Sequence, residues 1–461
     1  METMPRQAIN LGERGPHLLL VNLGLGQDKR GPLGYAETTY LMPDGSRYPT
    51  SLAGFALWKW LDATGRSPVA VVFACTESAW NQKQEALRKH AAELGLEPSK
   101  ISPPVILGLP QTLEDVWAMI EPMESRLRAY HDAAGPVLHL DLTHAFRAIP
   151  LAHLLIALYF QERGLATMGV CGYGVFQEGQ TETPYIDLSH LLHLARWAQA
   201  VRSFRERFDT TGLAGLLEQY EREARHAVVQ SGMVPPPEVR RLISAARLAG
   251  PYFAAGLPLE LGVHVGQTLG HTTRESLEKA ATKLVTAQQS LVLELFDALH
   301  PLTPGQVAKK SAKASLVLDK QELARQVRLL KLWLQAGLPE RALLVLREVV
   351  INRLLLAANP ESWLEHGIRE QAETVLNDVF RPEEPPLPSS PELKVLRSLW
   401  REITNRRNPL AHAGMCKSEV DVGQLSEAVE ELVEKLEALL ELDEPWQELA
   451  RQLSTSGEGK A

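Results

Sequence analysis

Residues 136–142 have the sequence PVLHLDL, and the polar segment THAFR follows directly at residues 143–147. A short apolar run that stops abruptly is typical of a strand buried on both faces of a parallel sheet. The next segment, 150–163, is apolar and of helical length. Because a buried strand, a polar turn and a covering helix form the repeating unit of α/β folds, this stretch predicts such a fold for the first part of the chain.

The same alternation continues on both sides of this stretch. Asp44-Gly45 lies between the strand-forming segments 38–40 and 47–48, which predicts a hairpin. We therefore predict that residues 1–190 form a Rossmann-like α/β domain with a parallel sheet covered on both faces. Further strands are expected at 17–23, 69–74, 104–107, 167–173 and 184–187, and further helices at 52–61, 79–94 and 112–130.

From about residue 188 onward the pattern is helical throughout. Residues 191–461 are therefore expected to form an all-α domain, interrupted by the proline-rich segment 382–391, in which no helix can form. Helices are expected at 191–208, 213–229, 237–248, 274–299, 316–335, 339–358, 362–380, 392–407 and 425–453.

Composition limits the classes of function. The chain has 461 residues, enough for two or three domains, and a net charge of −8, which argues against a broadly basic nucleic-acid coat but not against a local basic cleft. Its three cysteines, Cys75, Cys171 and Cys416, are far apart, as expected in a reducing cytoplasm. No signal-like or membrane-spanning apolar run is evident, so a soluble cytoplasmic protein is expected.

Ligands of open parallel sheets bind beyond the carboxyl ends of the strands. Three loops are expected there, and they supply flexible backbone amides, hydroxyls, an imidazole and a guanidinium, which suit a phosphate-rich ligand. The candidate binding residues are Gly24, Leu25, Gly26, Thr76, Ser78, Thr143, His144 and Arg147. The segment Gly24–Gly26 equally suits a plain structural turn. His139, Asp141 and His144 are not expected to form a metal site.

A second group of candidates lies in the segment RNPLAH at residues 407–412. Pro409 predicts that one helix ends near Arg407 and that another begins. Arg407 and His412 would then lie beside a turn, where arginine can bind phosphate and histidine can move a proton. Together they offer what RNA cleavage needs without a metal, although a solvated helix end is the simpler interpretation of this spacing alone.

The segment Asp141–Pro150 resembles the DxTHG-type motif of CRISPR-associated CARF-domain proteins, with Ala145 in place of the usual glycine. Three more segments match that family in order, so the resemblance covers roughly residues 16–190. The helical half resembles a HEPN domain through Arg407 to His412. The matching segments are LVNLGLG at 20–26, the region 35–48, and Tyr173-Gly174.

The resemblance implies a homodimer whose CARF-like domain binds a cyclic oligoadenylate, expected to be cyclic tetra-adenylate, made by a type III CRISPR complex. It also implies a metal-independent HEPN endoribonuclease that cleaves single-stranded RNA, with Arg407, Asn408 and His412 as catalytic residues and no cofactor. No membrane partner is implied.

Three alternatives remain open from the sequence. The helical half could be a dimerisation domain of a non-catalytic regulator that binds a cyclic nucleotide. A nicotinamide-dependent enzyme would need the third glycine of the dinucleotide fingerprint, which the segment at Gly24 lacks. The N-terminal site could also slowly cleave its own ligand, with His144 taking part.

Overall fold

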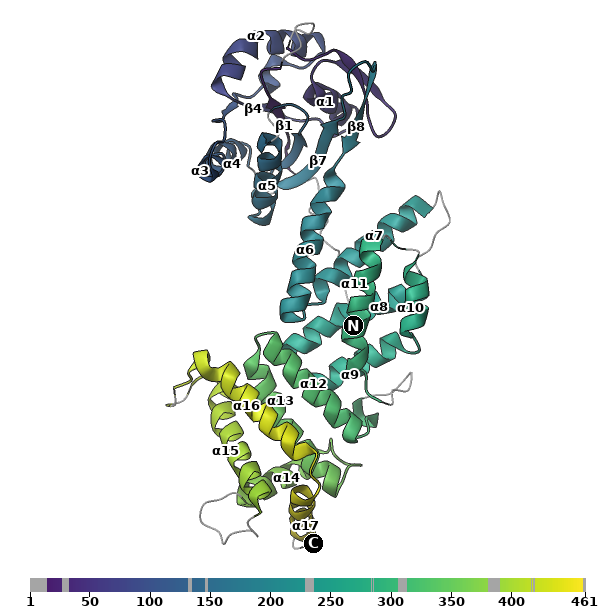
Figure 1. Ribbon diagram of the computed structural model, residues 1–461, viewed down its shortest axis with the longest axis vertical. Helices are drawn as coiled ribbons and strands as arrows, with labels where there is room; N and C mark the ends of the chain where they lie inside the picture. The colour runs from purple at the N-terminus through teal and green to yellow at the C-terminus, as the bar shows by residue number, and fades with distance from the viewer. Residues whose placement is uncertain are drawn as a thin grey trace, which may run out of the picture. The chain divides into compact units, whose positions relative to one another are not determined.

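The computed structural model describes residues 15–26, 33–131, 135–145, 148–228, 236–282, 284, 286–305, 313–379, 390–415, 417 and 419–458. The chain divides into two compact units, Met1–Arg196 and Trp197–Ala461 (Figure 1). The division falls within helix α6 (Ser189–Arg207).

The first unit is built on an eight-stranded sheet with the order β3-β2-β8-β7-β6-β1-β4-β5. Strands β5, β4, β1, β6 and β7 run parallel, whereas β8 is antiparallel to β7, and β3 is antiparallel to β2. The predicted hairpin at Asp44-Gly45 is confirmed as β2 and β3. The strands are β1 (His17–Leu23), β2 (Thr38–Leu41), β3 (Arg47–Thr50), β4 (Ala70–Cys75), β5 (Val105–Ile106), β6 (Val137–Asp141), β7 (Thr167–Gly174) and β8 (Glu182–Asp187).

Helices cover both faces of this sheet (Figure 1). Alternate residues of β1 explain the two layers, since Leu19 and Val21 pack with α1 and α2 while Leu18 and Leu20 pack with α4 and α5. The helices of this unit before α6 are α1 (Ala53–Ala63), α2 (Glu77–Glu93), the short 3₁₀ helix η1 (Pro98–Lys100), α3 (Leu113–Ala118), α4 (Ile120–Arg128) and α5 (Ala148–Glu162).

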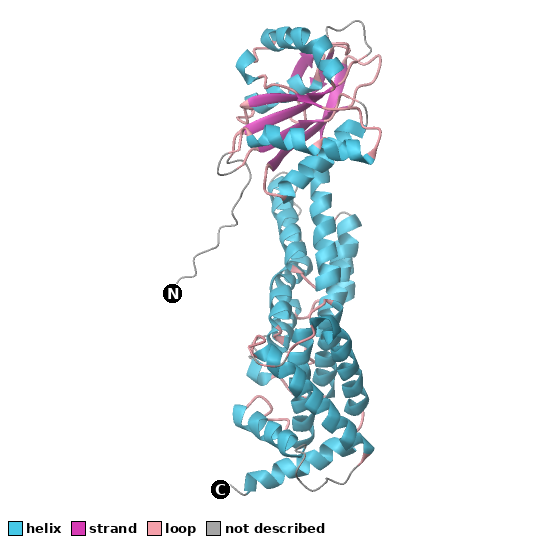
Figure 2. Cartoon of the chain, turned by 90° about the vertical axis from the view of Figure 1, so that its left-hand side faces the viewer, coloured by secondary structure: helices cyan, strands magenta, loops and turns pink. Residues whose placement is uncertain are grey.

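All strands of the described residues belong to the first unit, and the regular structure described in the second unit is helical (Figure 2). The expected order, an α/β part followed by an all-helical part, is confirmed. Its helices after α6 are α7 (Thr211–Val228), α8 (Pro237–Ala255), α9 (Pro258–Leu269), α10 (Arg274–Ala281), α11 (Thr286–Leu299), η2 (His300–Leu302), η3 (Lys313–Ser315), α12 (Lys320–Gln335), α13 (Pro339–Ala358), α14 (His366–Val379), α15 (Pro391–Ala411), α16 (Val422–Leu440) and α17 (Glu444–Glu458).

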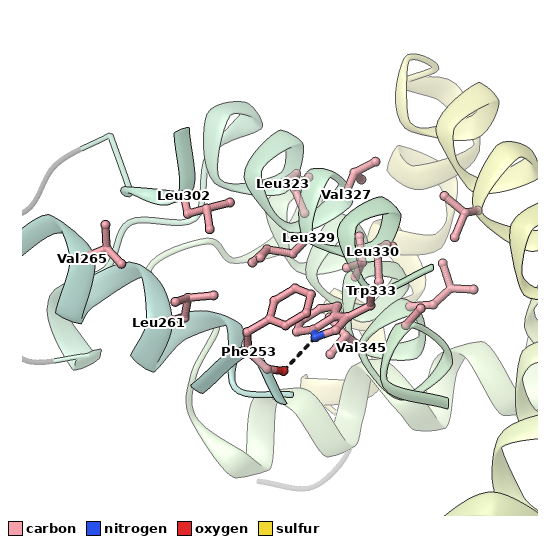
Figure 3. Close-up of a cluster of buried hydrophobic side chains, with 14 of the residues drawn as sticks. Phe253, Leu261, Val265, Leu302, Leu323, Val327, Leu329, Leu330, Trp333 and Val345 are labelled. Atoms are coloured by element: carbon pink, nitrogen blue, oxygen red, sulfur yellow. Dashed lines mark hydrogen bonds between the residues drawn. The ribbon is translucent and has the colours of Figure 1, made fainter. Parts of the chain in front are cut away.

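One apolar core runs through the second unit. Figure 3 shows where α8 and α12 meet, with the rings of Phe253 and Trp333 stacked at a centroid distance of 5.3 Å. The indole N–H of Trp333 donates to the backbone oxygen of Phe253 at 2.8 Å, so this buried polar group is satisfied. No described helix is both long and apolar enough to cross a membrane.

Sequence periodicity missed one helix and merged others. Helix α9 was not predicted, because Gly262 and Gly266 lower helix propensity. The structure explains the glycine at position 262, since a Cβ atom there would lie 2.6 Å from Arg325 Nη1. The helix expected over 274–299 ends at Ala281 and resumes at Thr286. The one expected over 425–453 is split into α16 and α17.

Candidate functional site

Three of the predicted loops lie together at one edge of the sheet. Strand β1 is the central member of β6-β1-β4, and all three run parallel. Leu23 at the end of β1 is in register with Cys75 at the end of β4, and Val21 with Asp141 at the end of β6. The loops that begin at Gly24, Thr76 and Leu142 therefore emerge side by side; we call this region the strand-end site.

Gly24 packs backbone to backbone against the loop that follows β6. A Cβ atom at Gly24 would lie 3.1 Å from the Cα atom of Ala145, closer than such contacts normally are. The Tyr35 hydroxyl accepts a hydrogen bond from the Gly24 N–H at 2.9 Å and donates to the Gly24 oxygen at 2.7 Å. The next two residues, Leu25 and Gly26, are exposed.

Ala145 has a φ of 109°, a backbone conformation that strongly favours glycine. This is the position at which the resembling motif has its glycine. The alanine is therefore held in a strained conformation by the tight packing of its loop against Gly24.

Thr143 is fixed by hydrogen bonds within the protein. Its hydroxyl donates to Asp141 Oδ1 at 2.6 Å and accepts from the Gly174 N–H at 2.9 Å. Asp141 is fully buried and also accepts from the Tyr185 hydroxyl at 3.1 Å, while its Oδ2 atom has no partner among the described residues. Burial raises the pKa of Asp141 to about 6. Thr143 therefore shapes its loop rather than offering a free hydroxyl.

His144 is held against Tyr35 and the start of α1. The two rings stack at a centroid distance of 4.0 Å, and the Ala53 N–H donates to His144 Nε2 at 3.3 Å. Leu52, which precedes α1, offers no side-chain cap, so the imidazole satisfies one of the free N–H groups of that helix end. Burial, together with the charge of Lys83, lowers the pKa of His144 to about 3.

Sequence reasoning did not identify Tyr35 and Lys83. The Lys83 Nζ atom lies 4.4 Å from the centre of the Tyr35 ring and donates to the backbone oxygen of Leu33. Lys83 is only 6% exposed, and burial lowers its pKa. The sequence did contain a signal that Lys83 is buried, because Lys83 occupies the apolar stripe of α2 between Ala79 and Leu87.

Thr76 and Ser78 lie at the start of α2. The Thr76 hydroxyl accepts from the Ala79 N–H at 3.3 Å and so caps the helix, whereas Ser78 is exposed and accepts from the Gln82 side chain at 3.1 Å. The positive end of the α2 dipole therefore faces the strand-end site. Arg147, the remaining candidate, lies outside the described residues.

The expected helix break at Arg407 is wrong. Helix α15 continues through Pro409 to Ala411, and His412 is its C-cap residue. Pro409 is tolerated because it lies in the last turn, and the carbonyl that it leaves without an N–H donor belongs to Asn405, which is exposed to water. Arg407, Asn408 and His412 are therefore consecutive parts of one helix end, which we call the helix-end site.

On that helix, Asn408 lies near both other candidates. Arg407 donates from Nη1 to Asn408 Oδ1 at 3.4 Å, and Asn408 and His412 are exposed and one turn apart. Five positions along a helix correspond to a rotation of about 140°, so Arg407 and His412 do not share a face. Arg407 is half-buried, and its Nε atom has no hydrogen-bond partner among the described residues.

The histidine that could suggest a metal site is engaged elsewhere. His139 Nδ1 accepts from the Val170 N–H at 2.9 Å, and its Nε2 atom lies 2.8 Å from His17 Nδ1. Burial lowers the pKa of His139 to about 3. Within the part of the chain that the structure describes, no group of His, Cys, Asp or Glu side chains is arranged to hold a metal ion.

Comparisons with known proteins found a likeness in structure but none in sequence. No protein-family model matches the chain, and no curated protein matches it in sequence. Among solved structures, the chain is similar to Enterococcus italicus Csm6 bound to cyclic hexa-2'-fluoro-hexa-dAMP, with 11% sequence identity and a TM-score of 0.38. The alignment covers 96% of this chain and 98% of that one. At this TM-score the likeness places no residue of either site.

Proposed function

We propose that this protein is a ribonuclease switched on by a cyclic oligoadenylate: the first unit, as a CARF-like domain, binds the ligand, and the helical unit, ending in a HEPN-like module, cleaves single-stranded RNA without a metal. The proposal places both activities in a homodimer of type III CRISPR defence. It depends above all on one observation, the convergence of the loops at Gly24, Thr76 and Thr143 on adjacent strand ends.

The strand-end site has the chemistry that such a ligand requires. Exposed backbone at Leu25 and Gly26, the Ser78 hydroxyl and the positive end of α2 can all bind phosphate oxygens. His144 adds an imidazole beside them, and Arg147 is proposed as a further cation of the same loop. Among the described groups named here, the backbone amides, the Ser78 hydroxyl and the positive end of α2 are neutral donors or dipoles.

The helix-end site has groups suited to RNA cleavage. The 2'-OH of a ribose attacks the adjacent phosphorus, the bond from phosphorus to the 5'-oxygen breaks, and a 2',3'-cyclic phosphate and a 5'-OH result. His412 removes or supplies a proton in this step, and the Arg407 guanidinium stabilises the charge on phosphate. Asn408, in contact with Arg407, orients the phosphate or the imidazole.

A single chain gives an incomplete version of this site. Arg407 and His412 lie on different faces of α15, and one chain supplies only one proton-transfer group. Two chains that meet at this helix end would bring both residue types from both copies to one phosphate, giving an acid and a base.

The position of Arg407 and His412 on different faces of α15 also favours a second candidate function. If the helix ends do not meet, the protein would be a non-catalytic regulator that binds the cyclic ligand and dimerises through its helical unit. Both candidates predict ligand binding, and only the first predicts RNA cleavage.

The test is cleavage of labelled single-stranded RNA in EDTA, with and without cyclic tri-, tetra- or hexa-adenylate. We expect one ring, by resemblance the tetra-adenylate, to stimulate cleavage that yields 2',3'-cyclic phosphates. His412→Ala should lower the rate by about 100-fold or more. His366→Ala is the matched control, since that histidine is 94% exposed on α14. Binding without any cleavage would establish the regulator, and wild-type cleavage by His412→Ala would remove the catalytic assignment.

A further inference from the structure

The apolar core of the helical unit contains a cluster of polar side chains on α12 and α13. Glu322, Arg325, Gln326 and Asn352 are each at most 4% exposed. Arg325 donates from Nε and Nη2 to the two carboxylate oxygens of Glu322, at 2.8 Å and 2.6 Å. Removing such groups from water costs free energy, and apolar residues of similar volume are often at least as stable. A role in fixing how the helices sit therefore explains the cluster better than added stability does.

Hydrogen bonds extend this cluster in both directions. Toward α9, Arg325 Nη1 donates to the backbone oxygen of Pro258 at 2.9 Å. Toward α13, the Gln326 side chain donates to Glu322 at 2.8 Å and accepts from the Asn352 side chain at 2.8 Å. Because an ionised carboxylate can only accept, the amide nitrogen of Gln326 must face Glu322, which leaves its oxygen for Asn352.

Asn352 joins the cluster to α14. Its Oδ1 atom accepts from Arg369 Nη1 at 2.7 Å, and Arg369 Nη2 donates to Glu348 Oε2 on α13 at 2.6 Å. The other carboxylate oxygen of Glu348 accepts from Arg347 Nη1 at 2.7 Å. A continuous series of polar contacts, which we call the polar chain, thus runs from Arg325 to Arg347.

The polar chain ends against Trp400 of α15, which is only 2% exposed. The Arg347 guanidinium lies 5.4 Å from the centre of the Trp400 ring, a cation–π contact. The indole N–H donates to Asn377 Oδ1 of α14 at 2.9 Å. Arg407 follows Trp400 by seven positions, which is nearly two full turns, so both residues lie on the same side of α15. The position of the helix-end site therefore depends on how Trp400 is held.

We infer that Asn352 and Arg369 are positioning residues of the helix-end site. They act through Arg347 and Trp400, which hold α15 where its last turn can present a cation and an imidazole to RNA. The reaction named in this inference rests on the proposed function, whereas the fixing of α15 by the polar chain does not.

Contacts that act in series behave differently from separate stabilising contacts. Asn352 and Arg347 are joined through Arg369 and Glu348. If each residue merely added stability, changing both would multiply their effects on α15. If they act in series, one break already frees Trp400, and a second break adds little.

The first experiment needs neither ligand nor RNA. Deuterium exchange of the full chain, followed by mass spectrometry, compares the peptides of α15 among variants. Asn352→Leu and Arg347→Met should each speed up exchange in α15 by about tenfold, as expected for one lost hydrogen bond, and the double variant should stay near tenfold. Thr210→Val is the matched control, because it removes an equally buried hydrogen bond, to the Gly250 N–H of α8, and should leave α15 unchanged.

Three results would overturn the inference: exchange in α15 that is about a hundredfold faster in the double variant, no acceleration in either single variant, or equal acceleration by Thr210→Val. If Asn352→Leu does not fold, Arg369→Lys takes its place. A single ammonium group cannot reproduce the bonds of the guanidinium to both Asn352 and Glu348, so Arg369→Lys should give the same tenfold effect.

The second experiment measures the reaction. Cleavage of single-stranded RNA by the wild type, stimulated by cyclic tetra-adenylate, is measured first, and its absence would refute the proposed function and the catalytic part of the inference. With an active wild type, Asn352→Leu should lower kcat by about tenfold and leave KM within about twofold, because a displaced α15 loses contacts made in the transition state. A loss confined to KM, or an equal loss of kcat in Thr210→Val, would contradict the positioning role.

Discussion

The strand-end site gathers its groups from the loops after β1, β4 and β6 and from α1 and α2, whereas the helix-end site takes every candidate from residues 407–412 of one helix. In the first, Gly24, Thr143 and His144 are already bonded to protein partners. In the second, Asn408 and His412 are exposed, and Arg407 Nε has no hydrogen-bond partner among the described residues. Groups that the protein already holds are in position before a ligand binds. The exposed groups of the helix end need another surface to fix them.

The largest expected effect is a loss of RNA cleavage when the helix-end site is changed. Arg407→Ala should lower ligand-stimulated RNA cleavage by about 100-fold to 1,000-fold, because the charge on the scissile phosphate loses its cation. Arg406→Ala is the matched control, since Arg406 is the exposed neighbour on the same helix. Cleavage rates of both variants, together with their thermal unfolding, check the prediction. Equal losses in the two variants would mean that only the helix surface matters.

The next effect concerns the strand-end site. Thr143→Val removes the hydroxyl that joins Asp141 to the Gly174 N–H, and so leaves a buried N–H unpaired. We expect ligand affinity to fall by about 10-fold to 30-fold, equivalent to about 1.4 to 2 kcal/mol, because the loop loses its fixed shape. Ser78→Ala, at an exposed hydroxyl, should cost less than Thr143→Val. Calorimetric titration with cyclic tetra-adenylate compares the two, and a larger loss at Ser78 would reverse the assigned roles.

A pH effect follows from Asp141, whose pKa rises from 3.8 to about 6 in the fold. Between pH 6 and pH 4 the folded protein takes up a proton on Asp141 while the unfolded chain does not. The free energy of unfolding should therefore rise as the pH falls through this window, by up to about 1.4 kcal/mol per pH unit from this group. Urea unfolding of wild type and Asp141→Asn at pH 4, 5, 6 and 7 measures this effect. The free energy of unfolding of the wild type should rise relative to that of Asp141→Asn as the pH falls. Parallel curves would show that Asp141 titrates alike in both states.

The smallest expected effect is a change in stability caused by Ala145 in the loop after β6. Ala145→Gly should stabilise the first unit by about 1 kcal/mol, because relief of the φ of 109° outweighs the added freedom of the unfolded chain. Ala148→Gly is the control, since Ala148 is exposed at the start of α5 and its replacement should destabilise slightly. Thermal unfolding of both variants measures the difference. A destabilised Ala145→Gly would mean that packing of the Ala145 methyl group outweighs the backbone strain.

Two features of the sequence predicted the fold well. Short apolar runs such as 17–23 and 136–142 correspond to β1 and β6, because a strand buried between helices must be apolar on both faces. The polar loops after them fell at one edge of the sheet because parallel strands end on the same side. Boundaries that depend on one residue were predicted less well. Pro409 illustrates this, because it lies within the last turn of α15 and does not end the helix before it.

What the sequence alone determined is therefore the order of strands and helices and the residue types at the loops, since both follow from local periodicity. Only the tertiary structure decided that Lys83 and Tyr35 stand beside His144 and that the Ala53 N–H donates to the His144 ring. The reason is distance along the chain: Ala53 and His144 are 91 residues apart, and Lys83 and Leu33 are 50 apart. No local pattern records contacts of that separation, and they exist only once the strands have paired.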